Sequence, residues 1–555
     1  MNAFDHVRRA WRTIRHRDRR RWKNGPRLHV ETRPVPAELT TSFAAASEAA
    51  LATIADVRWG RYNAVLGCLV IELDESADES TEGRIAAALA HLEERFGIAE
   101  LPFEDDEAAK HPGDDEPRVR TELELGLNVI ALGTGFAMRM AGARTAPIEL
   151  NIAALVAAVE GIPEARKILE ERLGRGTTEL GISFAKAVSG ALVQGALAPS
   201  VDAARRLIRL RELDARAAAF ASREAALCGD PDRHPTTRPQ IDERPVPLPP
   251  GPIERYAEKA TFASLGGASF GLASSQSLEG AAAGLIAGIP RPAYLGREAF
   301  ASWLGLLLGK RDVIVLQRDA LRRLDRIDTL VVEGELFVDP PEPDVDALIT
   351  AAKRAGLAIH RSGRKVASGA EGVRTLQGTG RAVMYVGSDD AALAAADVGV
   401  GLVVGTQVPF SADLLCSEDG LRDALVIVDS TRYARAASRQ AVRMAGVELA
   451  TGVLVTLGGA NSRTIRRVML AASATQVIAM ANGIRVAELV ARPPARGWRR
   501  PAVRFHSESA EAVLASLETR ALGLTDEEVD QRRPPTKQAR SRARQLVELV
   551  VQELD

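Results

Sequence analysis

The sequence predicts a chain of several domains that combines mixed α/β folds with Ala- and Gly-rich helices. Three observations lead to this prediction. Residues 28–103 alternate between strand and helix patterns, residues 311–417 carry short apolar runs between helical segments, and Ala/Gly-rich stretches lie between and after these regions. The chain has 555 residues, 46% of them hydrophobic and 26% charged, which is enough for roughly three or four domains with buried cores.

The composition excludes several classes of protein. The 72 Lys and Arg residues nearly balance the 73 Asp and Glu residues, so the formal net charge is −1 and we expect no specific binding of nucleic acid. The three cysteines, Cys68, Cys228 and Cys416, lie far apart and form no CxxC motif. The sequence therefore predicts neither a disulfide scaffold nor a zinc module, and it fits a reducing compartment.

Residues 1–27 form a basic leader, with ten Arg or Lys residues against two acidic ones and with Trp11 and Trp22 among them. The leader lacks the apolar core of a secretory signal, so nothing in it predicts export. We expect a solvated cytoplasmic leader. The alternative is an adaptor that binds lipid or RNA through these basic side chains.

Residues 28–103 predict a small mixed domain that opens with a strand. Leu28, Val30 and Thr32 lie on one side of this strand, and His29 and Glu31 lie on the other. The later elements, in the order helix, strand, strand, helix, strand, cover residues 39–54, 59–62, 66–73, 85–96 and 98–103. This βαββαβ order is ferredoxin-like and resembles the heavy-metal-associated domains of some transport ATPases.

Those metal-binding domains hold soft metals through a CxxC loop after the first strand. Here the corresponding turn, residues 33–36, reads Arg-Pro-Val-Pro and offers no thiolate. We therefore expect a docking module without a metal.

Ala- and Gly-rich stretches follow an acidic loop and mark the regions 120–228, 260–310 and 418–492 as helical. None is a clean run of about 20 strongly apolar residues. Small residues suit contacts between membrane helices, so we expect membrane-associated helices, with a soluble bundle as the alternative. A linker at 229–259 carries eight prolines and is predicted to be extended. The stretches are 125–138, 149–162, 181–203, 260–289, 299–309, 447–459 and 468–490.

Residues 311–417 predict a parallel α/β sheet, because short apolar runs alternate there with helical segments. The runs are 313–316, 330–336, 358–361, 382–386 and 398–404.

Several segments of this half of the chain resemble, in order, the motifs of P-type ATPases, whose phosphorylation domain is haloacid-dehalogenase-like. Residues 322–332 read RRLDRIDTLVV, similar to the ERLGRVDTVVF that precedes the phosphorylated DKTGT. Residues 385–399 read YVGSDDAALAAADVG, similar to MVGDGxNDAPALAAADVG. Residues 420–446 look like the helix that returns to the membrane, and residues 288–297, GIPRPAYLGR, occupy the place of the proline-broken fourth membrane helix.

The resemblance also identifies catalytic positions that this sequence has lost. Glu333 stands where the family has its phosphorylated Asp, and residues 334–336, Gly-Glu-Leu, replace the Lys, Thr and Gly that follow it. The magnesium motif GDGxND is reduced to Gly-Ser-Asp-Asp at 387–390. Asp389 and Asp390 are weak candidates for Mg²⁺, and the alternative is that Ser388 or Asp389 caps the next helix.

Spacing supports the same interpretation. Pumps of this family insert a nucleotide-binding domain after DKTGT, whereas only residues 338–346 lie between the strand and the next helix here. The interval 205–259 also contains no TGES motif. We therefore expect no ATPase activity, no working catalytic residue, and no cofactor except weakly bound Mg²⁺.

The last segment, residues 505–555, resembles the small domain that begins cation pumps, because residues 523–533 match GLTxxEVxxRR. The whole arrangement resembles the amino-terminal half of the long, duplicated P-type ATPases of some GC-rich bacteria. We expect a split or truncated product of such a gene.

The resemblance implies a protein of the cell membrane, with its ferredoxin-like and haloacid-dehalogenase-like domains on the cytoplasmic side. Its expected role is structural or regulatory, its expected partner is the catalytic half of a cation pump, and membrane lipid is expected around its helices. The alternative enzyme is a haloacid-dehalogenase-type phosphohydrolase, which needs a carboxylate nucleophile at Glu333.

Overall fold

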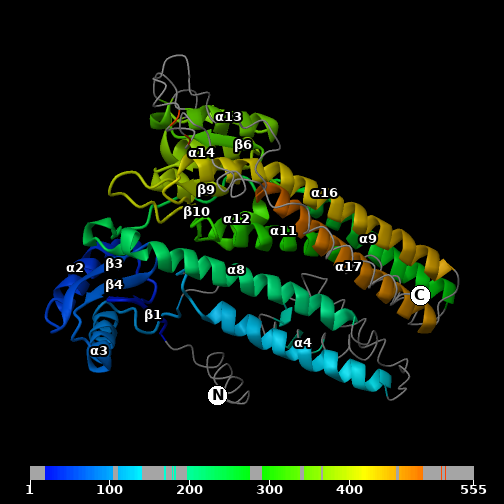
Figure 1. Cartoon of the computed structure of the whole chain (residues 1–555), viewed down its shortest axis with the longest axis horizontal. Helices are drawn as coiled ribbons and strands as arrows, with labels where there is room; N and C mark the ends of the chain where they lie inside the picture. Colours follow the sequence, from blue (N-terminus) through cyan, green and yellow to red (C-terminus); the bar gives the residue numbers. More distant parts are fainter. Residues whose placement is uncertain are drawn as a thin grey trace. The chain divides into compact units, whose positions relative to one another are not determined.

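The structure is a computed structural model of the whole chain (Figure 1). It describes residues 19–103, 111–140, 197–275, 290–337, 343–363, 367–457 and 462–491, with single positions at 168, 169, 178, 181, 182, 185, 514 and 519. The chain forms two compact units, Met1–Arg492 and Pro493–Asp555, and every element below belongs to the first. The predicted helix at 149–162, most of the basic leader and the pump-like motif at 523–533 lie outside the described residues.

The amino-terminal domain is an antiparallel sheet with two helices. The sheet order is β1-β2-β4-β3, and the tight hairpin between β1 and β2 places Gly25 at a φ of 57°. The elements are β1 (Arg21–Asn24), β2 (Arg27–Glu31), α2 (Thr40–Leu51), β3 (Val57–Asn63), β4 (Cys68–Leu73) and α3 (Glu79–Arg95), with the short 3-10 helix η1 (Ala37–Leu39) before α2.

The predicted final strand at 98–103 is wrong, and so is the boundary of the leader. Residues 98–103 are described and form no strand, whereas β1, inside the predicted leader, occupies the sheet edge beside β2. A hairpin needs only two turn residues, so β1 closes this edge at low entropic cost. Ile98 is buried in the core instead, after a turn at Gly97 with a φ of 69°.

The two faces of β2 confirm the alternation that the sequence predicts. Leu28 and Val30 are each 1% exposed and belong to the core that contains Phe43 of α2 and Ile85 of α3. His29 points to the opposite face, which helix α8 (Leu197–Cys228) covers. Both faces of this sheet are therefore buried.

The helical part consists of long helices packed through small residues. Helices α9, α11, α16 and α17 lie side by side, and α4 lies beside α8 (Figure 1). A Cβ atom on Gly483 would lie 2.4 Å from the carbonyl oxygen of Gly296, so only glycine allows this approach of α17 to α11. The helices are α4 (Glu116–Met140), α9 (Pro252–Ser275), α11 (Arg291–Gly309), α16 (Leu421–Leu457) and α17 (Ser462–Ala491).

Two findings bear on the expectations for these regions. The linker predicted at 229–259 ends earlier, because α9 begins at Pro252. The fixed φ of proline suits the first turn of a helix. A short 3-10 helix, η2 (Pro231–Arg233), also interrupts the linker. Among the helices in the described ranges, none has the length and apolar character that a bilayer crossing requires.

The second sheet is the parallel sheet that the sequence predicts, with one antiparallel edge strand. Its order is β5-β10-β9-β8-β6-β7, and only β5 runs antiparallel to its neighbour. The strand predicted at 330–336 ends at Val332, and β10 was not predicted because two residues carry no periodicity. The strands are β5 (Ile314–Val315), β6 (Thr329–Val332), β7 (Ala358–Arg361), β8 (Val383–Gly387), β9 (Val398–Gly401) and β10 (Leu414–Leu415).

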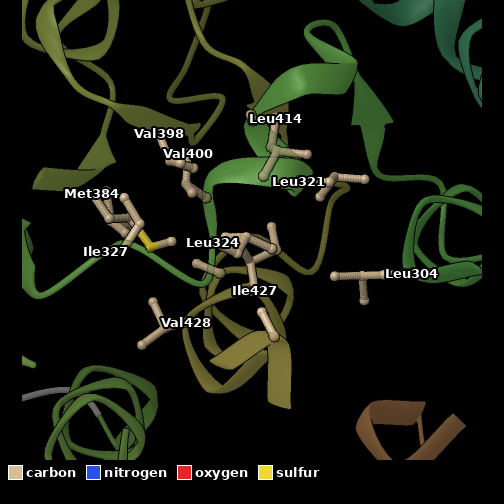
Figure 2. Close-up of a cluster of buried hydrophobic side chains, with 14 of the residues drawn as sticks. Leu304, Leu321, Leu324, Ile327, Met384, Val398, Val400, Leu414, Ile427 and Val428 are labelled. Carbon is tan, nitrogen blue, oxygen red and sulfur yellow. The ribbon is translucent and has the colours of Figure 1, made fainter. Parts of the chain in front are cut away.

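One core joins this sheet to the long helices. Figure 2 shows Leu304 of α11 and Ile427 of α16 in the same cluster as Met384 of β8 and Val398 of β9. The shorter helices around the sheet are α12 (Arg318–Arg323), α13 (Pro343–Arg354), α14 (Gly369–Gly378) and α15 (Asp390–Ala395), with the 3-10 turn η3 (Gly334–Leu336) after β6. β6 pairs in parallel with both β7 and β8, so the carboxyl ends of these three strands lie at the same edge of the sheet.

Candidate functional site

The carboxyl edge of the parallel sheet brings together residues from three strands. Glu333 directly follows β6, Ser362 directly follows β7, and Ser388 directly follows β8. Ligands of open α/β sheets bind at this edge because loops there can vary without disturbing the core. This edge is the candidate site that the sequence indicates through Glu333, Asp389 and Asp390.

The carboxylate of Glu333 is held by the strand beside it. Its Oε2 accepts hydrogen bonds from the backbone N–H of Ser388 at 2.6 Å and from the Ser388 hydroxyl at 3.0 Å. A Cβ atom on Gly387 would lie 2.5 Å from this same oxygen, so only glycine leaves room for the carboxylate. The side chain of Glu333 is thus folded against β8, with one oxygen already bound by two donors.

The turn after Glu333 is fixed to β7. The guanidinium of Arg361 donates a hydrogen bond to the carbonyl oxygen of Gly334 at 3.0 Å and lies over the ring of Phe337, 4.7 Å from its centre. A Cβ atom on Gly334 would lie 2.6 Å from the carbonyl oxygen of Ser362. The neighbouring Glu335 is exposed. These contacts stabilise η3 in one conformation.

The two Mg²⁺ candidates have separate partners. Asp389 caps α15, because its Oδ1 accepts hydrogen bonds from the backbone N–H groups of Ala391 at 3.0 Å and Ala392 at 3.1 Å. Asp390 accepts one from the backbone N–H of Ser411 at 3.1 Å, and burial raises the pKa of its carboxyl group. This geometry corresponds to the capping interpretation for Asp389. Mg²⁺ binding by the pair stays a prediction.

The sequence motifs identified Glu333 and the segment 387–390 that binds it, but they missed Arg361 and Ser362, which hold the turn after Glu333. Arg361 and Ser362 carry no motif of their own. Their positions in the chain could have identified them, because each one ends or directly follows a predicted parallel strand.

A second cluster of polar residues lies between β2 and α8. His29, Glu224 and Cys228 are each at most 2% exposed, and their potential ligand atoms lie within 4.8 Å of one another. The sequence could not predict this group, since 195 residues separate His29 from Glu224. Its donor set, one imidazole, one carboxylate and one thiol, raises the question of a metal.

Hydrogen bonding fixes the tautomers of the histidines in this cluster. The backbone N–H of Gly113 donates to Nδ1 of His111 at 3.2 Å, so the proton of His111 is on Nε2. That Nε2–H donates to Nδ1 of His29 at 3.0 Å, and Nε2–H of His29 donates to Glu224 at 3.0 Å. Each ring nitrogen therefore already has a partner, and His29 has no free lone pair for a metal.

The charges in the cluster are also balanced without a metal. Nε of Arg27 donates to both carboxylate oxygens of Glu224, at 2.8 and 2.7 Å. Burial alone would raise the pKa of Glu224, but the hydrogen bonds from His29 and Arg27 lower it, while burial raises the pKa of the Cys228 thiol. A carboxylate paired with arginine beside a protonated thiol does not fit a metal centre. The cluster is a hydrogen-bonded chain that joins the sheet to α8.

Comparisons with known proteins complete the description of the site. No protein-family model matches the chain. The "Probable cation-transporting ATPase I" of Mycobacterium leprae (strain TN) is 29% identical over 366 residues, covering 57% of this chain and 22% of the relative. The protein of the same name from Mycobacterium tuberculosis (strain CDC 1551 / Oshkosh) is 26% identical over 366 residues, again 57% of this chain and 22% of the relative.

Among solved structures, a zinc-transporting PIB-type ATPase in its E2.Pi state aligns with 66% of this chain and 100% of that chain, at 13% identity and a TM-score of 0.42. The chain spans about 22% of the length of the curated relatives it matches.

Proposed function

Since the chain is related over part of its length to P-type cation-transporting ATPases, we propose that it serves a cation pump as a non-catalytic partner. Its role is structural or regulatory, and its partner is a complete P-type pump unit, on the same or on another polypeptide. Phosphoryl transfer takes place on the partner.

The observation that carries this proposal is the pair formed by Glu333 and Ser388. A nucleophilic carboxylate must present a free oxygen in line with the phosphorus atom, and a displacement of about 1 Å can cost about 100-fold in rate. Glu333 has one more methylene group than aspartate, and its Oε2 is bound by two donors of Ser388. The residues that follow it supply neither a lysine nor a hydroxyl group for a phosphate.

The connection after η3 supports the same conclusion. η3 ends at Leu336 and α13 begins at Pro343, so residues 337–342 are the whole connection. Independently folding domains generally need more than about 40 residues to bury a core. A nucleotide-binding domain therefore cannot be inserted at this position.

Exposed apolar side chains support association of the long helices with a membrane or with a membrane-embedded partner. Ile130 of α4 is 68% exposed, Phe262 of α9 is 78% exposed, Val447 of α16 is 64% exposed and Ile478 of α17 is 56% exposed. Large apolar residues that several helices present to solvent are typical of interaction surfaces. In this proposal the helices contact the bilayer or the pump, and both sheets lie on the cytoplasmic side.

Turnover measurements test the absence of catalysis. The purified full chain is incubated with Mg²⁺ and either ATP or p-nitrophenyl phosphate, beside Glu333→Gln and the matched control Glu335→Gln, which changes an exposed neighbour. We expect all three proteins to release phosphate at the background rate. Hydrolysis that Glu333→Gln abolishes and Glu335→Gln preserves would show a phosphohydrolase instead.

Association with a pump is tested separately. We expect the tagged full chain, solubilised with detergent from membranes of its native cells, to co-purify with a P-type pump whose ATPase activity changes when the chain is removed. Recovery of the chain in the soluble fraction without a pump would contradict the proposed partnership.

A further inference from the structure

Helix α8 presents a row of charged residues to α4, α11 and α12, and most of them are paired. Arg206 pairs with Glu124 of α4 at 3.0 Å. Glu212 pairs with Arg318 of α12 at 3.0 Å and with Arg322 of α12 at 2.8 Å. The side chains that α8 contributes to these pairs are almost completely removed from water, Glu212 being 2% exposed and Arg206 being 3% exposed.

Arg209 lies in the middle of this row and differs from its neighbours. It makes no hydrogen bond or ion pair with any described residue, and its Nε is shielded from solvent without an acceptor. The two carboxylates that act on it electrostatically are Glu124 and Glu298. Both are already engaged, Glu124 by Arg206 and Glu298 by Arg322 at 2.8 Å.

Four charged side chains act on Arg209 electrostatically, two cations and two carboxylates. Both carboxylates are already paired with other arginines. Burial and the nearby charge of Arg318 lower the pKa of Arg209 to about 10. The cations are Arg205 and Arg318, and the carboxylates are Glu124 and Glu298.

Shielding the Nε–H of a guanidinium from water without an acceptor is costly, and proteins pair such groups with an anion. Arginine binds phosphate-type oxyanions especially well, because its planar fork can donate two parallel hydrogen bonds. We propose that α8, α11 and α12 form an oxyanion site in which Arg209, flanked by Arg205 and Arg318, binds a phosphate group. The phosphate comes either from solution or from the headgroup of an anionic lipid. This inference does not depend on the proposed pump partnership.

Thermal unfolding of the full chain tests the site. Wild type, Arg209→Gln and the matched control Arg211→Gln, which changes an exposed arginine on the same helix, are compared in chloride and in phosphate at equal ionic strength. We expect phosphate to raise the Tm of wild type and Arg211→Gln by about 2–4 °C more than that of Arg209→Gln. In chloride, Arg209→Gln should be at least as stable as wild type, because it removes an uncompensated charge.

A second variant separates charge from geometry. Arg209→Lys keeps the positive charge but loses the planar fork, so its response to phosphate should fall between those of wild type and Arg209→Gln. If phosphate raises the Tm of wild type, Arg209→Gln and Arg209→Lys equally, the proposal that Arg209 binds phosphate from solution is overturned.

Vesicles distinguish the two sources of phosphate. The full chain is floated with vesicles of phosphatidylcholine alone and of phosphatidylcholine with phosphatidic acid. If the ligand is a lipid headgroup, wild type and Arg211→Gln should bind the vesicles with phosphatidic acid severalfold more strongly than Arg209→Gln does. A free phosphate as ligand predicts a thermal shift without this lipid effect. If neither the shift nor the lipid effect depends on Arg209, no oxyanion site exists there.

Discussion

The two sheets of this molecule place their polar residues in opposite ways. The amino-terminal sheet buries a chain of polar groups against α8, in which His29 is 2% exposed and Glu224 is fully buried. The parallel sheet gathers its polar groups at the carboxyl edge, where Glu333, Ser362 and Ser388 meet and where Glu333 is partly exposed.

This difference separates a buried hydrogen-bonded cluster from polar groups at the open edge of a sheet. Both carboxylate oxygens of Glu224 and both ring nitrogens of His29 have hydrogen-bond partners, and both side chains are buried, so a change there should lower the stability of the fold strongly. Around Glu333 the backbone keeps the shape of a ligand-binding edge, but the side chain itself fills the space beside Gly387. Mutations should therefore affect stability strongly at the first region and weakly at the second.

The largest expected effect comes from Glu224→Ala. Removing this carboxylate leaves His29 buried without its acceptor and leaves Arg27 with Glu72 as its remaining partner, which should lower the free energy of unfolding by about 3–5 kcal/mol. Denaturation followed by Trp fluorescence measures it, because Trp22 lies 5.0 Å from the ring of His29. The control is Glu48→Ala, which removes a surface pair with Arg61 and should cost about 0–1 kcal/mol. Similar losses in the two variants would mean that the buried chain is not structural.

Adding a methyl group at the carboxyl edge of the parallel sheet should have a smaller effect on stability. The added Cβ of Gly387→Ala would lie 2.5 Å from Oε2 of Glu333, so we expect a loss of about 1–3 kcal/mol. Combining it with Glu333→Gly, which also removes the Cβ atom of Glu333 that would lie 2.6 Å from the new methyl group, should restore much of this stability, as measured by urea denaturation. Gly83→Ala is the matched control, since nothing lies within 4 Å of its Cβ position in α3. Equal costs with and without Glu333 would show that this side chain does not occupy the edge.

Acid should weaken the amino-terminal region before the parallel sheet. Burial lowers the pKa of both His29 and His111 below the ordinary value of 6.5, so both rings are neutral when folded. Their stabilising contribution is complete above pH 6.5 and is lost as pH falls below it, because the unfolded chain then binds more protons. The free energy of unfolding should fall between pH 7 and 5, and His111→Asn should reduce this slope. An unchanged slope in the variant would contradict the assignment of neutral rings.

The smallest effect is expected from Asp389→Ala. The change removes the cap of α15 and should lower the free energy of unfolding by about 1 kcal/mol. Asp390→Asn, which keeps an acceptor for Ser411, should cost less. Equilibrium unfolding with and without Mg²⁺ measures both effects. Stabilisation by Mg²⁺ that either variant abolishes would identify a metal-binding pair instead of a cap.

Patterns of apolar residues predicted most elements of both sheets. The five runs between 313 and 404 correspond to strands, because buried parallel strands are nearly continuous in apolar residues. The two strands that were missed, β1 and β10, contain no long apolar run. Two of the four residues of β1, Arg21 and Lys23, are basic, and β1 pairs with β2 through the hairpin.

The candidate site was predictable only in part. Glu333 could be found from the motif around it, and the carboxyl-edge rule explains why it lies near Ser388. That Glu333 binds Ser388, while Asp389 and not Ser388 caps α15, depends on the close approach of β6 and β8 at Gly387. The contact of His29 with Glu224 depends on the docking of α8 onto the sheet, and no local pattern encodes it.

Trapping of an acyl phosphate tests the central claim most directly. The full chain is incubated with Mg²⁺ and ATP labelled at the terminal phosphate, quenched in acid, and treated with hydroxylamine to identify carboxyl-linked phosphate. We predict no incorporation above that of Glu333→Gln, because the carboxylate is bound by Ser388 and only residues 337–342 separate η3 from α13. Hydroxylamine-sensitive label approaching one phosphate per chain, and absent from Glu333→Gln, would contradict the account.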